Sequence, residues 1–316
     1  MTTMSTDTLA WLLDSDPSIR WQVLRDLTDA PADEVAAERA KVATSGLGRY
    51  LLSKQDADGQ WDGGVYRPGW VQEDRPYYDA WTATHFALLD LTAFGLDPES
   101  AEARAAVALV RERVRWDDGG RPYFEGEVEP CINGAVLLNA AYYGQDGSEV
   151  AATLLRTRLS DGGWNCDDDP TVSSFHSTIT PIEGLLAWER AGHATPELTA
   201  ARTGGEDYLL ERGLIRRRST RELADPRFAM LSSAPRWFHD VLRGLDHFRL
   251  ADRRDPRLAE PVELVRAKAD ADGRWANELT HEGPTWFPVD EESKPSRSVT
   301  LRVLRVLRWW DAGGRP

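Results

Sequence analysis

The sequence predicts an all-α protein, and three observations support this class. A phrase ending in Asp-Gly-x-Trp recurs along the chain. Apolar helical segments follow the copies, and those beginning near His85, Cys131 and His176 are about 45 residues apart. No segment alternates apolar and polar residues convincingly, so no strand is expected. Recurrence at this period indicates repeated helix pairs, each burying its apolar face against its neighbours.

Composition excludes several classes of function. The 316 residues carry a formal net charge of -14, whereas binding to nucleic acid or to an anionic membrane requires a basic face. No stretch reaches the length of a transmembrane helix, and the N-terminus lacks the basic flank of a secretory signal. Two cysteines do not make a disulfide framework. We therefore expect a cytoplasmic protein with reduced thiols.

The N-terminal region, residues 1–30, is predicted to form short helices. Asp16 and Pro17 supply the cap and first turn of the second of them. One longer helix is expected from about Ala32 to Lys54.

The recurring phrase is interpreted as a structural staple. Its Asp-Gly pair suits a tight turn after a helix, and its aromatic ring folds back onto neighbouring helices. Three copies have the tryptophan, and a degenerate copy, Asp117–Gly120, has Tyr123 and Phe124 instead. The full copies are Gln55–Trp61, Asp161–Trp164 and Asp270–Trp275.

The two cysteines and one histidine predict a metal site. Cys131 and His176 each begin an apolar helical segment, and Cys166 lies in the loop between them. Thiolate and imidazole are zinc ligands, and a helix N-terminus lowers the pKa of a thiol. The opposing interpretation is a small buried residue, a loop thiol and a helix cap. The grouping of Cys131, Cys166 and His176 within one repeat favours a site for one zinc per chain.

The staples and their spacing resemble the α/α toroids of squalene–hopene and oxidosqualene cyclases and of protein prenyltransferase β subunits. The phrase Gln55–Trp61 looks like the "QW" motif of terpene cyclases. The resemblance implies a single toroid over residues 1–316, built of outer and inner helices around a central cavity. It places the starts of the inner helices on one rim, with His85, Cys131, His176, His239 and Ser298.

The prenyltransferase resemblance extends to the metal. That family holds zinc with Asp-x-Cys and a histidine, which Glu129-Pro130-Cys131 and His176 match with Glu for Asp. Cys166 has no counterpart there, and the set Cys131, Cys166 and His176 is similar to the zinc ligands of lanthionine cyclases. Glu129, His239 or water is expected in the fourth position.

Carboxylates beside the predicted ligands are candidates for proton transfer. Asp167, Glu129 and His239 are the expected catalytic groups. The triplet Asp167–Asp169 loosely resembles the acid motif of squalene–hopene cyclases, although a solvated acidic loop is the simpler interpretation.

Aromatic and basic residues are expected to bind substrate at the cavity mouth. Two segments, Trp70–Trp81 and His281–Phe287, carry aromatic rings that suit an apolar or cationic guest. Diphosphate would need basic residues, for which Lys294 and Arg297 are candidates. The expected substrate-binding residues are His85, Trp81, Tyr78, Trp237, Trp286 and Arg297.

The leading hypothesis is a zinc-dependent enzyme that acts on a small apolar or prenyl-type substrate. One alternative is a metal-free terpene cyclase that starts its reaction with an acid. Another is a non-catalytic lipid- or peptide-binding toroid with a structural zinc. A separate partner subunit, which protein prenyltransferases require, stays open.

Overall fold

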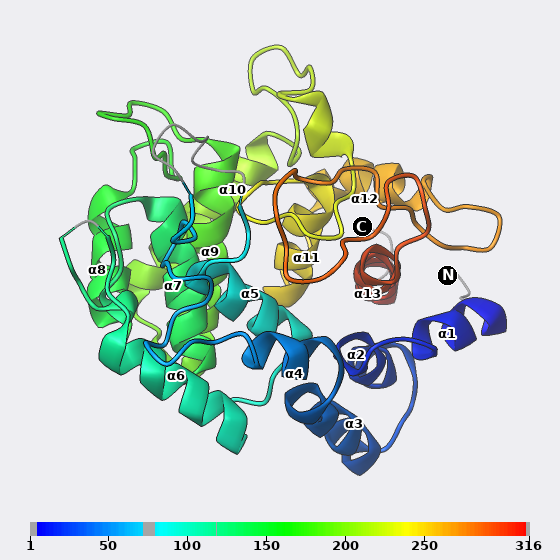
Figure 1. Ribbon diagram of the computed structural model, residues 1–316. Helices are drawn as coiled ribbons and strands as arrows, with labels where there is room; N and C mark the ends of the chain where they lie inside the picture. Colours follow the sequence, from blue (N-terminus) through cyan, green and yellow to red (C-terminus); the bar gives the residue numbers. More distant parts are fainter. Residues whose placement is uncertain (1–4, 72–79, 118, 314–316) are drawn as a thin grey trace. The chain divides into compact units, whose positions relative to one another are not determined.

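The computed structural model describes residues 5–71, 80–117 and 119–313, and the described part is all-α (Figure 1). Within these ranges the β pairings are isolated bridges in turns, and no strand forms. The prediction of an all-α protein is confirmed. None of the helices described has both the length and the apolar composition needed to cross a membrane.

The helices form two compact units. Unit 1 comprises residues 1–38, 207–281 and 288–316, and unit 2 comprises residues 39–206 and 282–287. The single toroid expected from the resemblance stays a prediction. The α-helices are α1 (Thr6–Leu13), α2 (Pro17–Leu27), α3 (Ala32–Thr44), α4 (Gly46–Leu52), α5 (Thr84–Phe94), α6 (Ala101–Arg113), α7 (Pro130–Tyr142), α8 (Ser148–Thr157), α9 (Phe175–Trp188), α10 (Pro196–Glu211), α11 (Val241–Leu250), α12 (Ala259–Arg266) and α13 (Arg297–Ala312).

The second N-terminal helix begins at the predicted cap. The Asp16 side chain accepts a hydrogen bond from the Ser18 backbone N–H, and Pro17 occupies the first turn of α2. The single helix expected from Ala32 to Lys54 is wrong. It is divided into α3 and α4 because Gly46 takes a φ of 62°, which a continuous helix does not allow.

The three tryptophan phrases are staples, as predicted. In each, the indole N–H donates to a carbonyl ten residues earlier, at the end of the preceding helix, over 2.8 Å. The same tryptophan's backbone N–H donates to a threonine hydroxyl in the first turns of the following helix, over 3.0–3.1 Å. The three sets are Leu51–Trp61–Thr84, Leu154–Trp164–Thr178 and Val265–Trp275–Thr300.

The turn before each tryptophan depends on its glycine. Gly59, Gly162 and Gly273 have φ values of 86°, 102° and 74°, which residues with a Cβ rarely adopt. In the degenerate copy Trp116 takes the staple's place, since its indole donates to the Tyr123 carbonyl over 3.0 Å and stacks on the Tyr123 ring. Each staple therefore ties one helix to the next.

Helices α7 and α9 make the most extensive contact between described elements (Figure 1). Their backbones touch, because a Cβ built on Gly134 would lie 2.3 Å from the Pro181 nitrogen, and one on Gly184 would lie 2.2 Å from the Gly134 carbonyl oxygen. Only glycine permits this approach. It places the beginnings of α7 and α9, and the loop that joins α8 to α9, in one region of unit 2.

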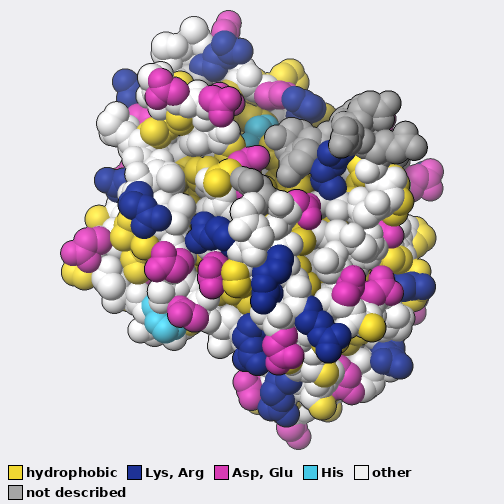
Figure 2. Space-filling view, turned by 60° about the vertical axis from the view of Figure 1, so that its left-hand side comes forward, with side chains coloured by type: hydrophobic (Ala, Val, Ile, Leu, Met, Phe, Trp, Pro, Cys, Tyr) yellow, Lys and Arg dark blue, Asp and Glu magenta, His cyan; other side chains and the backbone are white. Residues whose placement is uncertain are grey.

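The face drawn in Figure 2 carries basic and acidic side chains interspersed, with no extended basic region outside the grey part. The expectation that nucleic acid is not a partner is based on the net charge of -14 and stays a prediction.

Gly134→Ala should destabilise the protein by at least about 2 kcal/mol, because a methyl group forces two backbones apart and this strain exceeds the gain in helix propensity. Gly204→Ala in α10 is a matched control. Its Cβ would meet the flexible end of Arg158 at 3.0 Å, so it should be neutral or slightly stabilising. Urea unfolding of both variants measures the difference; equal stability would contradict the backbone contact.

Candidate metal centre

Glu129 and Cys131 are positioned by the loop that enters α7. The Asn133 side chain accepts from the Glu127 backbone N–H over 2.8 Å and donates to the Glu127 carbonyl over 2.6 Å. The Glu129 backbone N–H donates to the Glu127 carboxylate over 2.7 Å. Pro130 then begins α7 with its fixed φ, so Glu129 and Cys131 lie on the first turn.

Cys166 comes from the loop between the second staple and α9. Two residues before it, Trp164 is held by its staple, and its carbonyl accepts from the Ser174 backbone N–H over 2.8 Å. Asp161 holds the other end of the loop by accepting from the Ser173 N–H and hydroxyl. The loop that carries Cys166 is therefore anchored on both sides.

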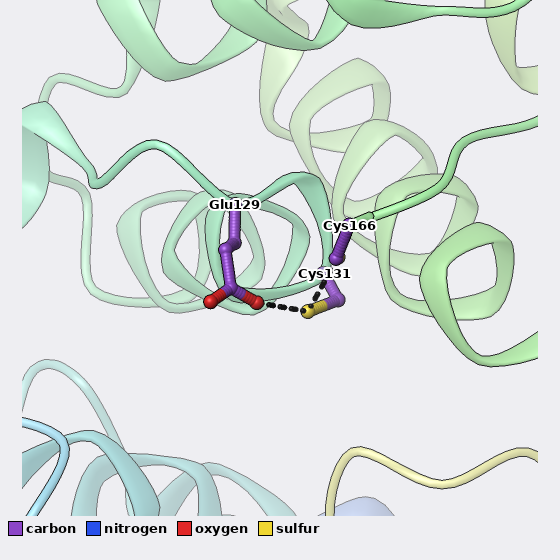
Figure 3. A group of neighbouring side chains, drawn as sticks. All are labelled: Glu129, Cys131 and Cys166. Atoms are coloured by element: carbon purple, nitrogen blue, oxygen red, sulfur yellow. Dashed lines mark hydrogen bonds between the residues drawn. The ribbon is translucent and has the colours of Figure 1, made fainter. Parts of the chain in front are cut away.

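These two segments bring three metal-ligand groups together (Figure 3). The sulfur atoms of Cys131 and Cys166 are 3.0 Å apart, and the Cys131 sulfur lies 3.6 Å from a Glu129 carboxylate oxygen. The three ligand atoms all lie within 4.8 Å of one another. Cys131 is buried, whereas Glu129 and Cys166 are half-buried, so the group is open to solvent on one side.

The three side chains of this group shift one another's pKa values. Burial and the neighbouring Glu127 carboxylate raise the pKa of Glu129. The hydrogen bond between the sulfurs, with burial, raises the pKa of Cys131, and the same bond lowers the pKa of Cys166. Cys166 is therefore the more acidic of the two thiols. The charged neighbours responsible are carboxylate and thiolate groups, so the site carries an excess of negative charge.

The donor set suits a divalent ion that accepts thiolate ligands, such as zinc. A tetrahedral zinc with usual bond lengths separates S and O ligands by about 3.5 Å and two S ligands by about 3.8 Å. The S–O separation of 3.6 Å meets the first value. The sulfurs, at 3.0 Å, must move apart to meet the second. Two thiolates and one carboxylate leave a fourth position for another ligand.

Two of the three predicted metal ligands meet, and the third does not join them. His176 is the second residue of α9, is half-buried, and is absent from the group formed by the described residues. Glu129, expected as a catalytic or fourth-ligand group, takes its place beside the sulfurs. The Glu-x-Cys spacing was the signal that identified it.

The other predicted catalytic groups, Asp167 and His239, are not members of the three-donor group. Asp167 follows Cys166 and is exposed, and it accepts a hydrogen bond from the Asn165 amide over 3.3 Å. Asp168 and Asp169 are exposed too, as a solvated loop requires. His239 belongs to unit 1, where it is buried and its Nε2 lies 2.7 Å from the Leu214 carbonyl oxygen.

Three predicted substrate-binding residues have side chains that contact other parts of the protein. His85 is enclosed by aromatic rings and lies 3.3 Å from the Tyr123 hydroxyl. The Trp81 indole donates to the Glu282 carbonyl, and the Trp286 indole donates to the Thr82 carbonyl, each over 2.8 Å. The two aromatic segments expected at one mouth are therefore hydrogen-bonded to each other, and both indole N–H groups are used in these bonds. Tyr78 lies outside the described residues.

Two further candidates belong to unit 1. Trp237 is half-buried and stacks on Phe238 at 3.8 Å, and Phe238 stacks on His281. Arg297 donates to the Trp11 carbonyl over 3.0 Å and covers the Trp11 ring. This guanidinium thus attaches α1 to α13, which the sequence interpretation as a diphosphate ligand did not anticipate.

One buried acid escaped the sequence interpretation. Asp240 is only 3 % exposed and caps α11 by accepting from the Arg243 backbone N–H over 2.7 Å. Burial raises the pKa of its carboxyl, and no described residue bonds its second oxygen. An aspartate before an apolar helical segment is the usual sign of a cap, and the structure shows that role.

The comparisons with known proteins identify no family. No family model matches the chain, and no curated protein matches it. A solved structure described as a protein from Actinoplanes aligns with a TM-score of 0.45 and 16 % identity, covering 94 % of this chain and 90 % of that one. A likeness of this degree supports no inference about function.

His85 should make the protein sensitive to acid. Burial lowers the pKa of His85 to about 3, well below the value of about 6.5 in an unfolded chain. Its contribution is fully present above pH 6.5 and is lost as the pH falls toward 3, because the unfolded state alone takes up the proton. At pH 4.5 the loss amounts to about 2–3 kcal/mol.

His85→Gln should therefore lose less stability than the wild type between pH 7 and pH 4.5, even if it is less stable at pH 7. Urea unfolding at both pH values measures this double difference. His193→Gln, at an exposed position, is the control and should keep the wild-type pH dependence. Equal pH dependence in all three proteins would refute the assignment.

Proposed function

We propose that this protein is a zinc-dependent enzyme in which Glu129, Cys131 and Cys166 hold the ion. The supporting observation is the convergence of three donor atoms within 4.8 Å at the beginning of α7. Zinc accepts sulfur and oxygen ligands, and catalytic zinc sites have three protein ligands with one position left for water or substrate. The bound ion supplies Lewis-acid activation of a thiol, water or carbonyl.

The chain's own groups prepare the site for a cation. Cys166 is the more acidic thiol, and an incoming cation favours loss of the proton from Cys131 as well. Asn133 holds the Glu127–Glu129 loop so that the Glu129 carboxylate faces the sulfurs. The half-buried Glu129 and Cys166 border the solvent side, through which a substrate reaches the fourth position.

The substrate class follows from the proposed architecture. Repeated helix pairs joined by staples support a toroid of the terpene cyclase and prenyltransferase type, whose cavity suits a small apolar or prenyl-type substrate. A cytoplasmic location is part of the proposal, because a dithiol site retains its metal in a reducing compartment. Chemistry that starts from diphosphate receives little support, since Arg297 is occupied by Trp11.

A structural zinc is the second candidate, and one observation favours it. Cys131 is buried, and the group joins the start of α7 to the loop before α9, two segments that a clamp would hold together. A clamp needs a fourth protein ligand, whereas catalysis needs an open position.

Purified wild-type protein should contain about one zinc per chain, and Glu129→Gln, Cys131→Ser and Cys166→Ser should each lose most of it, because three ligands are the minimum of such a site. Glu127→Gln is the matched control: it removes a neighbouring carboxylate but no proposed ligand, so its zinc content should be retained. Elemental analysis after purification without chelator measures both. A metal-free wild type that does not take up added zinc would overturn the proposal.

His176→Ala separates the enzyme from the clamp. With three ligands and an open position, the variant should retain about one zinc per chain, because His176 is outside the group. Loss of the metal in a variant with wild-type circular dichroism would instead make His176 the fourth ligand and favour the clamp. Competition with a chromogenic zinc chelator gives the affinities of both proteins.

A further inference from the structure

We propose that the metal site selects substrates whose metal-binding group is a thiol carried on a positively charged molecule, and that it rejects anionic ones. The inference rests on the proposed function and specifies its substrate. It is based on the charges that surround Glu129, Cys131 and Cys166, on the absence of basic residues from the segments that supply them, and on the charge of the ligand set.

Acidic residues border the donor group on both segments. Glu127 is hydrogen-bonded to the Glu129 backbone, and Asp167, Asp168 and Asp169 follow Cys166 directly and are exposed. Consecutive Cα atoms are 3.8 Å apart, so the first two of these aspartates start within about 8 Å of the Cys166 backbone. This separation is similar to the Debye length in physiological salt, so their charges act on a ligand at the fourth position.

No basic residue balances these charges within the two segments. Residues 122–155 and 159–189 contain neither Lys nor Arg. Four arginines border these segments: Arg121 donates to the Glu125 carbonyl over 2.8 Å, Arg156 to the Thr153 hydroxyl over 2.8 Å and Arg158 to the Ala200 carbonyl over 3.0 Å, and Arg190 comes after the last residue of α9. The segments that build the site therefore present only negative charge to a substrate.

The ligand set strengthens the preference. Two thiolates and a carboxylate carry three negative charges, so a divalent ion leaves the site with a net charge of about -1. Zinc accepts a soft thiolate as a further ligand, so a thiol suits the fourth position. A bound substrate thiolate brings the site to about -2, and a cationic group on the same molecule offsets this charge.

Exposed apolar side chains are available for the hydrocarbon part of the substrate that joins its thiol to its cationic group. Val128, beside Glu129, is 64 % exposed, and Val172 is 63 % exposed. The Val172 carbonyl accepts from the Asn165 amide over 2.9 Å, next to Cys166. These two exposed apolar side chains lie on the segments that carry Glu129 and Cys166, which agrees with a partly apolar substrate.

The test uses full-length protein loaded with Co²⁺, whose thiolate charge-transfer absorption reports each added thiol. The probes are 2-aminoethanethiol, 2-mercaptoethanol and mercaptoacetate, which are cationic, neutral and anionic. Affinities are compared per thiolate, over a pH series that corrects for the acidity of each probe. We expect the cationic probe to bind about tenfold more tightly than the anionic one at low salt, and the ratio to shrink in 0.5 M NaCl.

A variant with Asp167→Asn, Asp168→Asn and Asp169→Asn should retain cobalt but lose most of the preference. The charge-matched control, with Glu99→Gln, Glu112→Gln and Glu149→Gln at exposed positions beside or within α6 and α8, should keep it. Equal or reversed probe affinities with cobalt bound would overturn the inference and leave the metal site intact. Failure to bind cobalt would overturn the proposed function, and the inference with it.

Discussion

The contact between α7 and α9 is the constraint on which the rest of unit 2 depends. At Gly134 and Gly184 the helices meet backbone to backbone, at distances that any side chain would prevent. Because the helices approach so closely, the beginning of α7 and the loop before α9 lie together. The candidate metal-ligand group lies at that place, so the glycine contact between the two helices helps to position the donors.

The staples extend this constraint along the chain. Thr178, near the beginning of α9, accepts from the Trp164 backbone, and the Trp164 indole reaches back to the end of α8. Cys166 follows two residues later. The hydrogen bonds of Trp164 that tie α8 to α9 therefore also position the sulfur of Cys166.

Without a bound cation, electrostatic repulsion within this group reduces the stability of the folded protein. Burial and a neighbouring carboxylate raise the pKa of Glu129, and the hydrogen bond to Cys166, with burial, raises the pKa of Cys131. A divalent ion removes this repulsion, and folding then gains the free energy of metal binding. Under the proposed function, the same excess of negative charge that favours the ion also selects among the molecules that reach it.

The sequence by itself determined the helical class, the staples and the region of the candidate site. These features follow from local rules: glycine turns, caps and helical periodicity act over a few residues and are visible in the order of amino acids. The Glu-x-Cys pair and Cys166 were therefore identifiable as candidates. Tertiary structure decided which candidates meet. Glu129 rather than His176 joins the sulfurs, His85 is enclosed in the core, and Arg297 is taken by Trp11. The approach and rotation of packed helices set these outcomes, and they depend on contacts between residues distant in the chain.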